Sequence, residues 1–165
     1  MNINIKRLTD TATIPTKAHD TDACFDIYAD CPNDKYSAVV YNESSGNVDF
    51  IDEDGIKIAP GEWKTIHTGF CTEIPEGYFA PVFCRSGMGI KRHLRLSNSV
   101  GIIDSSYRGE WLVALHNDGK ENQIIKHGDR IAQFAILPVL DIQLNEVTDI
   151  SETDRGSSGF GSTGN

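Results

Sequence analysis

The chain has 165 residues, a mass of 18.2 kDa and a formal net charge of -9 at pH 7. This length predicts one domain that buries a conventional hydrophobic core without the help of metals or disulfides. The negative charge disfavours broad electrostatic binding to nucleic acid or to an anionic membrane surface, although a few local groups can still hold a small anionic ligand.

The N-terminal part of the chain predicts two short strands. Isoleucines alternate with polar residues over 2–8, which is typical of a strand with one buried face. A polar loop around Pro15 separates this strand from a second apolar run over 25–29.

Residues 33–55 predict an added hairpin at the surface. Runs rich in β-forming residues over 36–41 and 48–51 flank the turn-forming segment 42–47, and an acidic segment follows. This acidic, aromatic-containing lobe could bind a regulatory protein, or it could be a neutral insertion.

From Ile56 onward, short apolar runs alternate with turn sequences such as Pro-Gly at 60–61 and Asn-Asp-Gly at 117–119. This pattern predicts an all-β sandwich or barrel with one short helical turn near 86–91. The predicted strands cover residues 56–59, 62–68, 70–74, 78–84, 93–103, 107–116, 122–126, 130–139 and 142–147.

The cysteines and histidines indicate neither a disulfide framework nor a zinc site. The 4 cysteines form no CxxC pair, and the 5 histidines have no metal-ligand spacing. The N-terminal sequence has no apolar signal region, and no stretch has the roughly 18 apolar residues that cross a bilayer. We therefore expect a soluble, cytoplasmic protein with reduced thiols.

The first candidate site residues are Asp22 and Asp26, which lie four apart at the entry to the strand over 25–29. Two such carboxylates could hold a hydrated Mg2+, because this ion keeps several waters and needs few protein ligands. Alternatively, they could cap backbone amides in a loop.

A second candidate is the segment Arg85-Ser86-Gly87, where a strand ends and the helical turn is expected to begin. An arginine, a hydroxyl group and exposed helix amides together suit a phosphate. Ser86 could equally be the N-cap of the helical turn and bind nothing.

The third candidate is the loop around Asp104. An apolar run over 100–103 ends in Asp104, two serines and Tyr107, which predicts a strand, a tight turn and a strand, with Asp104 at the tip. With Asn98 upstream, such an arm could read the edge of a base, while Tyr107 lies against a sugar and Asp104 activates a water. The alternative is a local role, in which the carboxylate bonds its own backbone.

The fourth candidate is the strand that begins at Arg130. Arg130 and Gln133 enter an otherwise apolar strand and need polar partners, either a ligand or a neighbouring acid.

The fifth candidate is the glycine- and serine-rich tail over 155–165, whose composition is that of a disordered terminus. However, Phe160 could stack on a base, and Arg155 together with Ser162 and Thr163 could close over a polyphosphate.

Taken together, these five stretches, in this order and at this spacing, resemble the five motifs of the homotrimeric dUTPase family. The resemblance begins at Asp22, covers nearly the whole chain, and is most specific in GIIDSSYRG at 101–109 and RGSSGFGSTG at 155–164. It implies a distorted β-barrel of the jelly-roll type over residues 1–150, which includes the hairpin near 33–55. A flexible C-terminal arm over 151–165 would close over the active site.

The resemblance also implies an activity. Members of the family hydrolyse dUTP to dUMP and pyrophosphate by Mg2+-assisted attack of water at the α-phosphorus, which limits uracil in DNA and supplies dUMP for dTTP synthesis. The chain would form a homotrimer whose active sites combine loops from different subunits, with no nucleic-acid or membrane partner.

For each matching residue the resemblance implies a role. Asp104 would hold and activate the attacking water, Gln133 would lie near that water, and Asp26 would contact Mg2+ through water. The substrate-binding residues would be Arg85, Ser86 and Gly87 for the phosphates, Asn98, Gly101, Ile102 and Ile103 for uracil, Tyr107 for the deoxyribose, and Arg155, Phe160, Gly161, Ser162 and Thr163 of the arm for the γ-phosphate and the base.

Two positions depart from the family pattern, and two rival functions stay open. Cys24 stands where the first motif usually has glycine, and Cys84 stands where a proline usually precedes Arg85. A related dCTP deaminase would need a glutamate near the arm, for which Glu110 is the only one close by. A binding module that docks a regulator through the lobe at 33–55 is the other alternative.

Overall fold

The computed structural model describes residues 1–32, 40–42, 47–49 and 55–159. Short strands dominate it, and the one helical segment in this part of the chain is a single π-helical turn. The elements are β1 (Asn4–Arg7), β2 (Phe25–Tyr28), β3 (Val40–Asn42), β4 (Asn47–Asp49), β5 (Ile56–Ile58), β6 (Trp63–His67), β7 (Phe70–Glu73), β8 (Tyr78–Phe83), η1 (Gly87–Lys91), β9 (Leu94–Leu96), β10 (Gly101–Ile103), β11 (Leu112–Asn117), β12 (Gln123–Ile125), β13 (Arg130–Phe134) and β14 (Leu137–Pro138).

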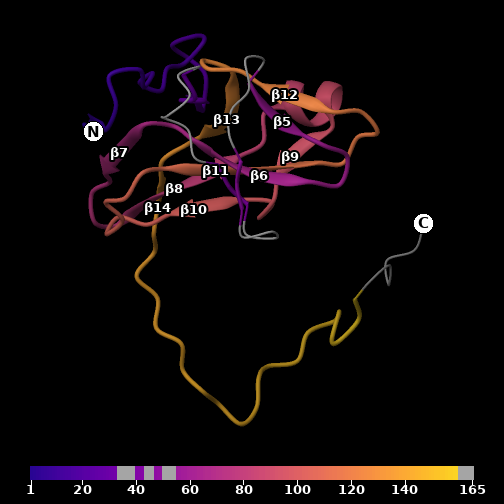
Figure 1. Cartoon of the computed structure of the whole chain (residues 1–165). Helices are drawn as coiled ribbons and strands as arrows, with labels where there is room; N and C mark the ends of the chain where they lie inside the picture. The colour runs from indigo at the N-terminus through magenta and orange to yellow at the C-terminus, as the bar shows by residue number, and fades with distance from the viewer. Residues whose placement is uncertain (33–39, 43–46, 50–54, 160–165) are drawn as a thin grey trace.

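The strands pair antiparallel in five sheets. The largest has the order β10-β8-β13-β2, with β14 also paired to β8, and a second has the order β6-β11-β9. The remaining sheets are the pairs β1-β7, β5-β12 and β3-β4 (Figure 1). The predicted all-β, jelly-roll type of fold is confirmed, although no sheet among the described residues closes into a barrel.

The core lies where the apolar faces of these sheets meet. Side chains on a strand alternate between two faces, so Ile56 and Ile58 of β5 are buried while Lys57 between them is exposed. Aromatic rings connect the sheets: the ring centroid of Trp111 lies 5.3 Å from that of Phe70 in β7 and 4.8 Å from that of Phe134 in β13. This contact holds the two larger sheets in a fixed relation to each other.

Several predicted strands are shorter than expected. The run over 93–103 is two strands, β9 and β10, because a turn over 97–100 with Ser99 at φ 63° interrupts it. The run over 107–116 begins only at Leu112, and the run over 130–139 breaks between β13 and β14. These runs were predicted as continuous strands from their apolar content, which does not reveal such local breaks.

The predicted strand over 142–147 is wrong for the single chain. Beyond β14 the chain leaves the sheets and runs through residues 139–150 without secondary structure (Figure 1). Leu140, Ile142 and Leu144 alternate with polar residues, as the prediction required, but they are 77%, 70% and 93% exposed. The periodicity is that of a strand, and no neighbouring strand within the described part of this chain pairs with it.

The predicted hairpin at 33–55 is confirmed in its central part. Val40, Tyr41 and Asn42 of β3 pair antiparallel with Asp49, Val48 and Asn47 of β4. The remaining residues of the lobe, 33–39, 43–46 and 50–54, lie outside the described part of the chain. Its use as a partner site stays a prediction.

The helical turn predicted near 86–91 is confirmed as η1. Arg92 fixes its end, since its guanidinium donates to the carbonyl of Ile124 at 2.5 Å and to Oε1 of Gln123 at 3.1 Å. In the described residues there is no helix with the length and apolar content needed to cross a membrane.

Gly69, in the turn between β6 and β7, gives a test of this packing. Its φ is +69°, and an added Cβ would overlap the Asp30 carboxylate and lie 2.7 Å from Cβ of Ala12. Gly61 has a similar φ of +76° but has open space around it. We expect Gly61→Ala to cost about 1–2 kcal/mol of backbone strain, and Gly69→Ala to cost about 1–3 kcal/mol more because of the overlap. Urea unfolding of the two variants measures the difference, and equal midpoints would contradict the packing described here.

Candidate active site

A cavity of about 270 Å³ gathers the residues of the third sequence motif. The loop from β9 to β10 supplies Asn98, β10 supplies Gly101, Ile102 and Ile103, and the turn after β10 supplies Asp104 and Tyr107. Gly101 packs closely here, because a Cβ would lie 3.2 Å from Cβ of Val82 on the neighbouring strand β8, which would have to shift slightly. Most of the residues predicted to bind the base and the sugar therefore lie in one wall of this cavity.

The side chain of Asp104 is exposed at the rim of this cavity. The turn is closed by the main chain, since the amide of Tyr107 donates to the carbonyl oxygen of Asp104 at 3.1 Å. No hydrogen bond of the Asp104 carboxylate occurs with the residues that the structure describes. The alternative of a purely local turn-capping role therefore has no support, and the carboxylate is available to a water or a substrate.

Tyr107 is folded back over Gly109. Its hydroxyl group donates to the carbonyl oxygen of Glu110 at 2.8 Å. A Cβ at Gly109 would overlap the tyrosine ring, so only glycine permits this approach. The ring is consequently held as one wall of the cavity.

Glu110 also lines the cavity, and it is a residue that motif reasoning considered only for a rival enzyme. Its Oε1 accepts hydrogen bonds from the amides of Thr68 and Gly69, and its Oε2 lies 2.8 Å from Nδ1 of His67. Burial alone would raise the pKa of Glu110, but the hydrogen bonds from His67, Gly69 and Thr68 outweigh it and hold the pKa below its ordinary value. Both oxygens of Glu110 are thus bound to residues 67–69, which does not suit the direct contact with a base that a deaminase requires.

Other cavity residues were not signalled by any motif. These are Val82, Leu96, Leu112, Val113 and Ala114, which come from β8, β9 and β11. They were predicted only as members of apolar strands, because a strand residue that faces a pocket and one that faces the core have the same alternation.

A second polar cluster contains the other predicted site residues that precede the C-terminal arm. Asp26 of β2 accepts a hydrogen bond from Nε of Arg85 at 2.6 Å and another from Nη1 of Arg130 at 3.1 Å. Gln133 lies opposite Asp26 in the β2-β13 register, and its Nε2 donates to the carbonyl of Cys84 at 3.2 Å. Of the two partners considered for Arg130, the structure shows the neighbouring acid. Asp22 instead accepts from the amide of His19 at 2.9 Å, which is the loop-capping alternative.

Ser86 and Gly87 continue this cluster at the start of η1. Ser86 is exposed, and its side chain makes no capping hydrogen bond to the helical turn. The capping alternative is therefore not what the structure shows, and the hydroxyl group stands beside Arg85 at the surface.

Asp104 and Arg85 lie toward opposite ends of β8, although Gly101 of the same cavity pairs with Val82 near the end that leads to Arg85. In the β8-β10 register, Ile103 pairs with Ala80, so Asp104 follows the first half of β8, whereas Arg85 follows the end of β8. At a strand rise of about 3.3 Å per residue, the separation along β8 is on the order of 15–20 Å. One chain therefore does not bring Asp104 together with Arg85, Gln133 and Asp26.

Of the predicted residues of the C-terminal arm, the structure describes Arg155, which is not brought to either cluster. Arg155 lies on the segment that has left the sheets, where its Nε donates to the carbonyl of Ser158 at 3.0 Å (Figure 1). Phe160, Gly161, Ser162 and Thr163 lie outside the described residues.

The chemistry of the second polar cluster decides whether it fits Mg2+. No group of three or more His, Cys, Asp or Glu within the described ranges could hold a metal ion by itself. Asp26 accepts one arginine N–H on each oxygen, and a carboxylate has about four acceptor positions, so it can still accept from a metal-bound water. This fits an ion that arrives with a triphosphate and keeps its waters, and it does not fit a protein-enclosed metal.

Of the cysteines at the two departures from the motif pattern, Cys84 has a structural role. Sγ of Cys84 donates to the carbonyls of Arg85 and Leu94, which ties the start of the phosphate cluster to β9. Burial raises the pKa of the Cys24 and Cys84 thiols, and it raises the pKa of Cys31 to about 12. All 4 cysteines are free thiols, and these three are not activated as nucleophiles.

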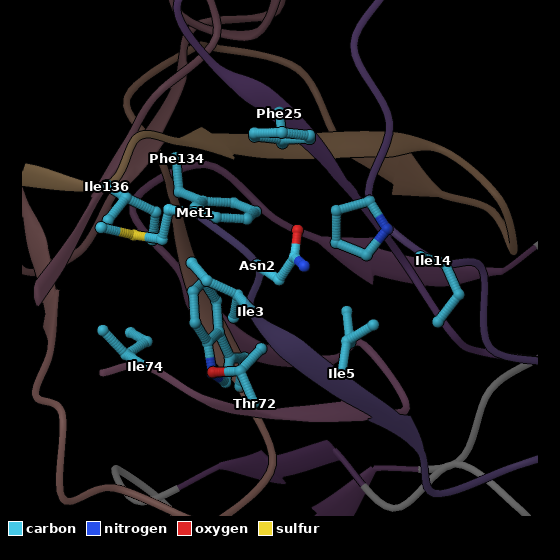
Figure 2. A pocket seen from close by; sticks show the side chains of 12 residues that line it. Met1, Asn2, Ile3, Ile5, Ile14, Phe25, Thr72, Ile74, Phe134 and Ile136 are labelled. Carbon is cyan, nitrogen blue, oxygen red and sulfur yellow. The ribbon is translucent and has the colours of Figure 1, made fainter.

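A second hollow lies elsewhere and is almost entirely apolar. It has a volume of about 530 Å³, and Figure 2 shows Ile3, Ile5, Ile74 and the rings of Phe25 and Phe134 around it. No predicted site residue and no charged residue lines it. Its chemistry suits an apolar chain segment and does not suit a nucleotide.

Comparison with known proteins agrees with the geometry. A model of the family described as dUTPase matches residues 48–164. The deoxyuridine 5'-triphosphate nucleotidohydrolase of Clostridioides difficile is 37% identical over 163 residues, which cover 99% of this chain and 98% of that protein. The corresponding protein of Desulfitobacterium hafniense is 49% identical over 110 residues, which cover 66% of this chain and 73% of that protein.

Solved structures give the same result. A mutant of the dUTPase of phage 80alpha matches with a TM-score of 0.77 and 26% identity, covering 98% of both chains. Another mutant of the Staphylococcus bacteriophage 80alpha dUTPase, with dUpNHpp, matches with a TM-score of 0.74 and 27% identity over 99% of this chain and 98% of that one. The family model and the full-length relatives, together with the cavity built from the GIIDSSYRG segment, show that this chain belongs to the dUTPase family.

Proposed function

We propose that this chain hydrolyses dUTP to dUMP and pyrophosphate by Mg2+-assisted attack of water at the α-phosphorus. The observation that carries the proposal is the cavity of about 270 Å³ that collects Asn98, the backbone of β10, Asp104 and Tyr107. The reaction would lower dUTP, limit uracil in DNA and supply dUMP for dTTP synthesis. With no membrane-spanning helix in the described residues, a cytoplasmic location is part of the same proposal.

In this proposal, the nucleoside lies in the cavity. Asn98 and the main chain of Gly101, Ile102 and Ile103 read the edge of uracil, because exposed amides and carbonyls of an arm fit the donors and acceptors of a flat base. Tyr107 packs against the deoxyribose. Asp104 orients the attacking water and takes its proton.

The phosphates bind to the second cluster. Arg85 offers a guanidinium that is held in place by Asp26, and Ser86 and Gly87 add a hydroxyl group and a flexible main chain. Gln133 would lie near the attacking water. Mg2+ bound to the triphosphate supplies charge neutralisation and orientation of the phosphates, with Asp26 contacting one of its waters.

The separation of the two clusters along β8 supports a homotrimer with shared active sites. A site that needs Asp104 and Arg85 together is incomplete in one chain when on the order of 15–20 Å of strand lies between them. Two copies that pack side by side can combine the nucleoside cavity of one with the phosphate cluster of the other. The arm over 151–165, with Arg155, Phe160, Gly161, Ser162 and Thr163, would then close over the completed site.

The apolar pocket and the exposed segment after β14 support the same assembly. Leu140, Ile142 and Leu144 present an unpaired strand pattern, and the pocket of about 530 Å³ offers an apolar surface for it on a second copy. Two buried polar atoms of pocket-lining residues, Nε1 of Trp111 and Oγ1 of Thr72, have no partner among the described residues. The main chain of an incoming strand carries acceptors for both groups.

The lobe at 33–55 remains a proposed site for a regulatory protein. The Staphylococcus bacteriophage 80alpha dUTPase, which is 27% identical to this chain, belongs to phage dUTPases described as controlling transfer of virulence genes. We keep this binding role as an addition to catalysis.

Substrate choice tests the proposed activity. With Mg2+ present, we expect release of pyrophosphate from dUTP, with dUMP as product, and little or none from dCTP, dTTP or UTP. Parallel assays with chromatographic identification of the nucleotide products measure this. Deamination of dCTP would move the chain to the rival enzyme class, and inactivity toward all four would leave only a binding module.

Asp104→Asn tests the general base. The variant keeps the shape of the side chain but cannot accept the proton of the water, so we expect kcat to fall by about 10²–10⁴-fold. Binding of a non-hydrolysable dUTP analogue, measured by calorimetry, should change little. Asp10→Asn, at an exposed position outside the cavity, is the control with normal turnover. Full activity of Asp104→Asn would remove this residue from the mechanism.

Light scattering tests the assembly. We expect the full chain to have three times the 18.2 kDa mass of one chain. The double variant Ile142→Asp, Leu144→Asp should dissociate and lose activity, because charges cannot enter an apolar pocket unpaired. Gln143→Asp with Asn145→Asp adds the same charge to the other side of the segment and should stay trimeric. A stable, active wild-type monomer would overturn the shared-site model.

A further inference from the structure

The carboxylate of Glu110 is bound entirely by one turn of the protein. Oε1 accepts from the amide of Gly69 at 2.8 Å and from that of Thr68 at 3.1 Å, while Oε2 lies 2.8 Å from Nδ1 of His67. These three residues are consecutive: His67 ends β6, and Thr68 and Gly69 connect it to β7. Glu110 thus fastens the end of the Asp104 loop to this turn.

The turn itself is fixed to the core, so it can act as an anchor. Oγ1 of Thr68 donates to the carbonyl of Trp111 at 2.6 Å, and the amide of Trp111 donates to the carbonyl of Phe70 at 3.0 Å. The amide of Leu8 donates to the carbonyl of Gly69 at 2.7 Å. Trp111 is 1% exposed, so the residue that follows Glu110 is buried among the aromatic rings of the core.

The main chain of Glu110 transmits this anchorage to Tyr107. Its carbonyl oxygen accepts the hydrogen bond of the Tyr107 hydroxyl at 2.8 Å, and the ring lies directly over Gly109. Tyr107 is 42% exposed, so few other contacts restrain its ring. The position of the Tyr107 ring therefore depends on Glu110, whose carbonyl oxygen accepts its hydrogen bond.

We propose that Glu110 is a positioning residue, which holds Tyr107 against the sugar and so sets the preference for deoxyribose over ribose. This inference rests on the proposed hydrolysis of dUTP, in which Tyr107 packs on the deoxyribose. A ring that is held in one position leaves no room for a 2'-hydroxyl group. Without the contacts of Glu110, the ring can shift by a fraction of an ångström or up to about one ångström. Such a shift makes room for a 2'-hydroxyl group.

The test compares kcat and KM for dUTP and for UTP in five proteins and one control. The proteins are the wild type, Glu110→Ala, Glu110→Gln, Tyr107→Phe and the double variant Glu110→Ala, Tyr107→Phe. Glu73→Ala is the matched control, because Glu73 is an exposed glutamate of β7 that accepts one hydrogen bond from Asn4 at 2.8 Å. Thermal melting of each variant reports folding.

We expect Glu110→Ala to lower the ratio of kcat/KM for dUTP to that for UTP by about tenfold, mainly through a higher KM for dUTP. Glu110→Gln should recover most of the ratio, because its amide oxygen still accepts from Thr68 and Gly69. Glu73→Ala should keep the ratio of the wild type. The double variant should be no worse than the more affected single variant, because both changes break the same link.

Other results separate this inference from the proposed function. A wild type that does not hydrolyse dUTP overturns the proposed function and this inference with it. A wild type that prefers dUTP over UTP, with an unchanged ratio in a folded Glu110→Ala variant or with additive effects in the double variant, overturns only the inference. If Glu110→Ala does not fold, the Tyr107→Phe variant provides the test. An unchanged ratio of kcat/KM for dUTP to that for UTP in this variant overturns the proposal.

Discussion

The antiparallel pairing of β8 with β10 on one side and with β13 on the other is the constraint on which the rest of the site depends. Because β10 runs opposite to β8, the residue after β10 and the residues after β8 leave the sheet at opposite ends. Asp104 and Arg85 are thereby kept apart along β8 within one chain. In the proposed reaction, which needs both residues at one substrate, this register leaves the site incomplete in a single chain.

Within the phosphate cluster, the dominant interaction is that of one carboxylate with two guanidinium groups. Asp26 is buried to 8% exposure and joins β2 to the end of β8 and to the start of β13 through Arg85 and Arg130. A buried carboxylate with two such partners is satisfied, and only loss of both guanidinium groups would leave its charge unpaired. The same contacts that join the strands also fix the direction of Arg85, the arginine proposed to bind the phosphates.

Sequence reasoning predicted the parts of this molecule that local chemistry determines. Glycines and turn residues marked the strand ends, and the third motif gave the cavity wall from Asn98 to Tyr107 because it is continuous in the chain. It did not find Val82 or Leu112, which face the cavity from ordinary apolar strands. It did not find the clamp of Glu110 on His67, Thr68 and Gly69 either, because a contact across more than 40 residues depends on the register of β6 with β11. The strand predicted over 142–147 failed because pairing needs a partner that the periodicity alone does not provide.

In the proposed shared-site assembly, the separation of Asp104 from Arg85 along β8 makes the activity depend on protein concentration. An active site that is assembled from more than one copy exists only in the associated fraction of the protein, so mass action enters the rate. Specific activity then falls on dilution below the dissociation constant of the assembly, although no residue of the chain has changed. A substrate that bridges the two half-sites holds the copies together, so saturating nucleotide would protect the enzyme from this loss.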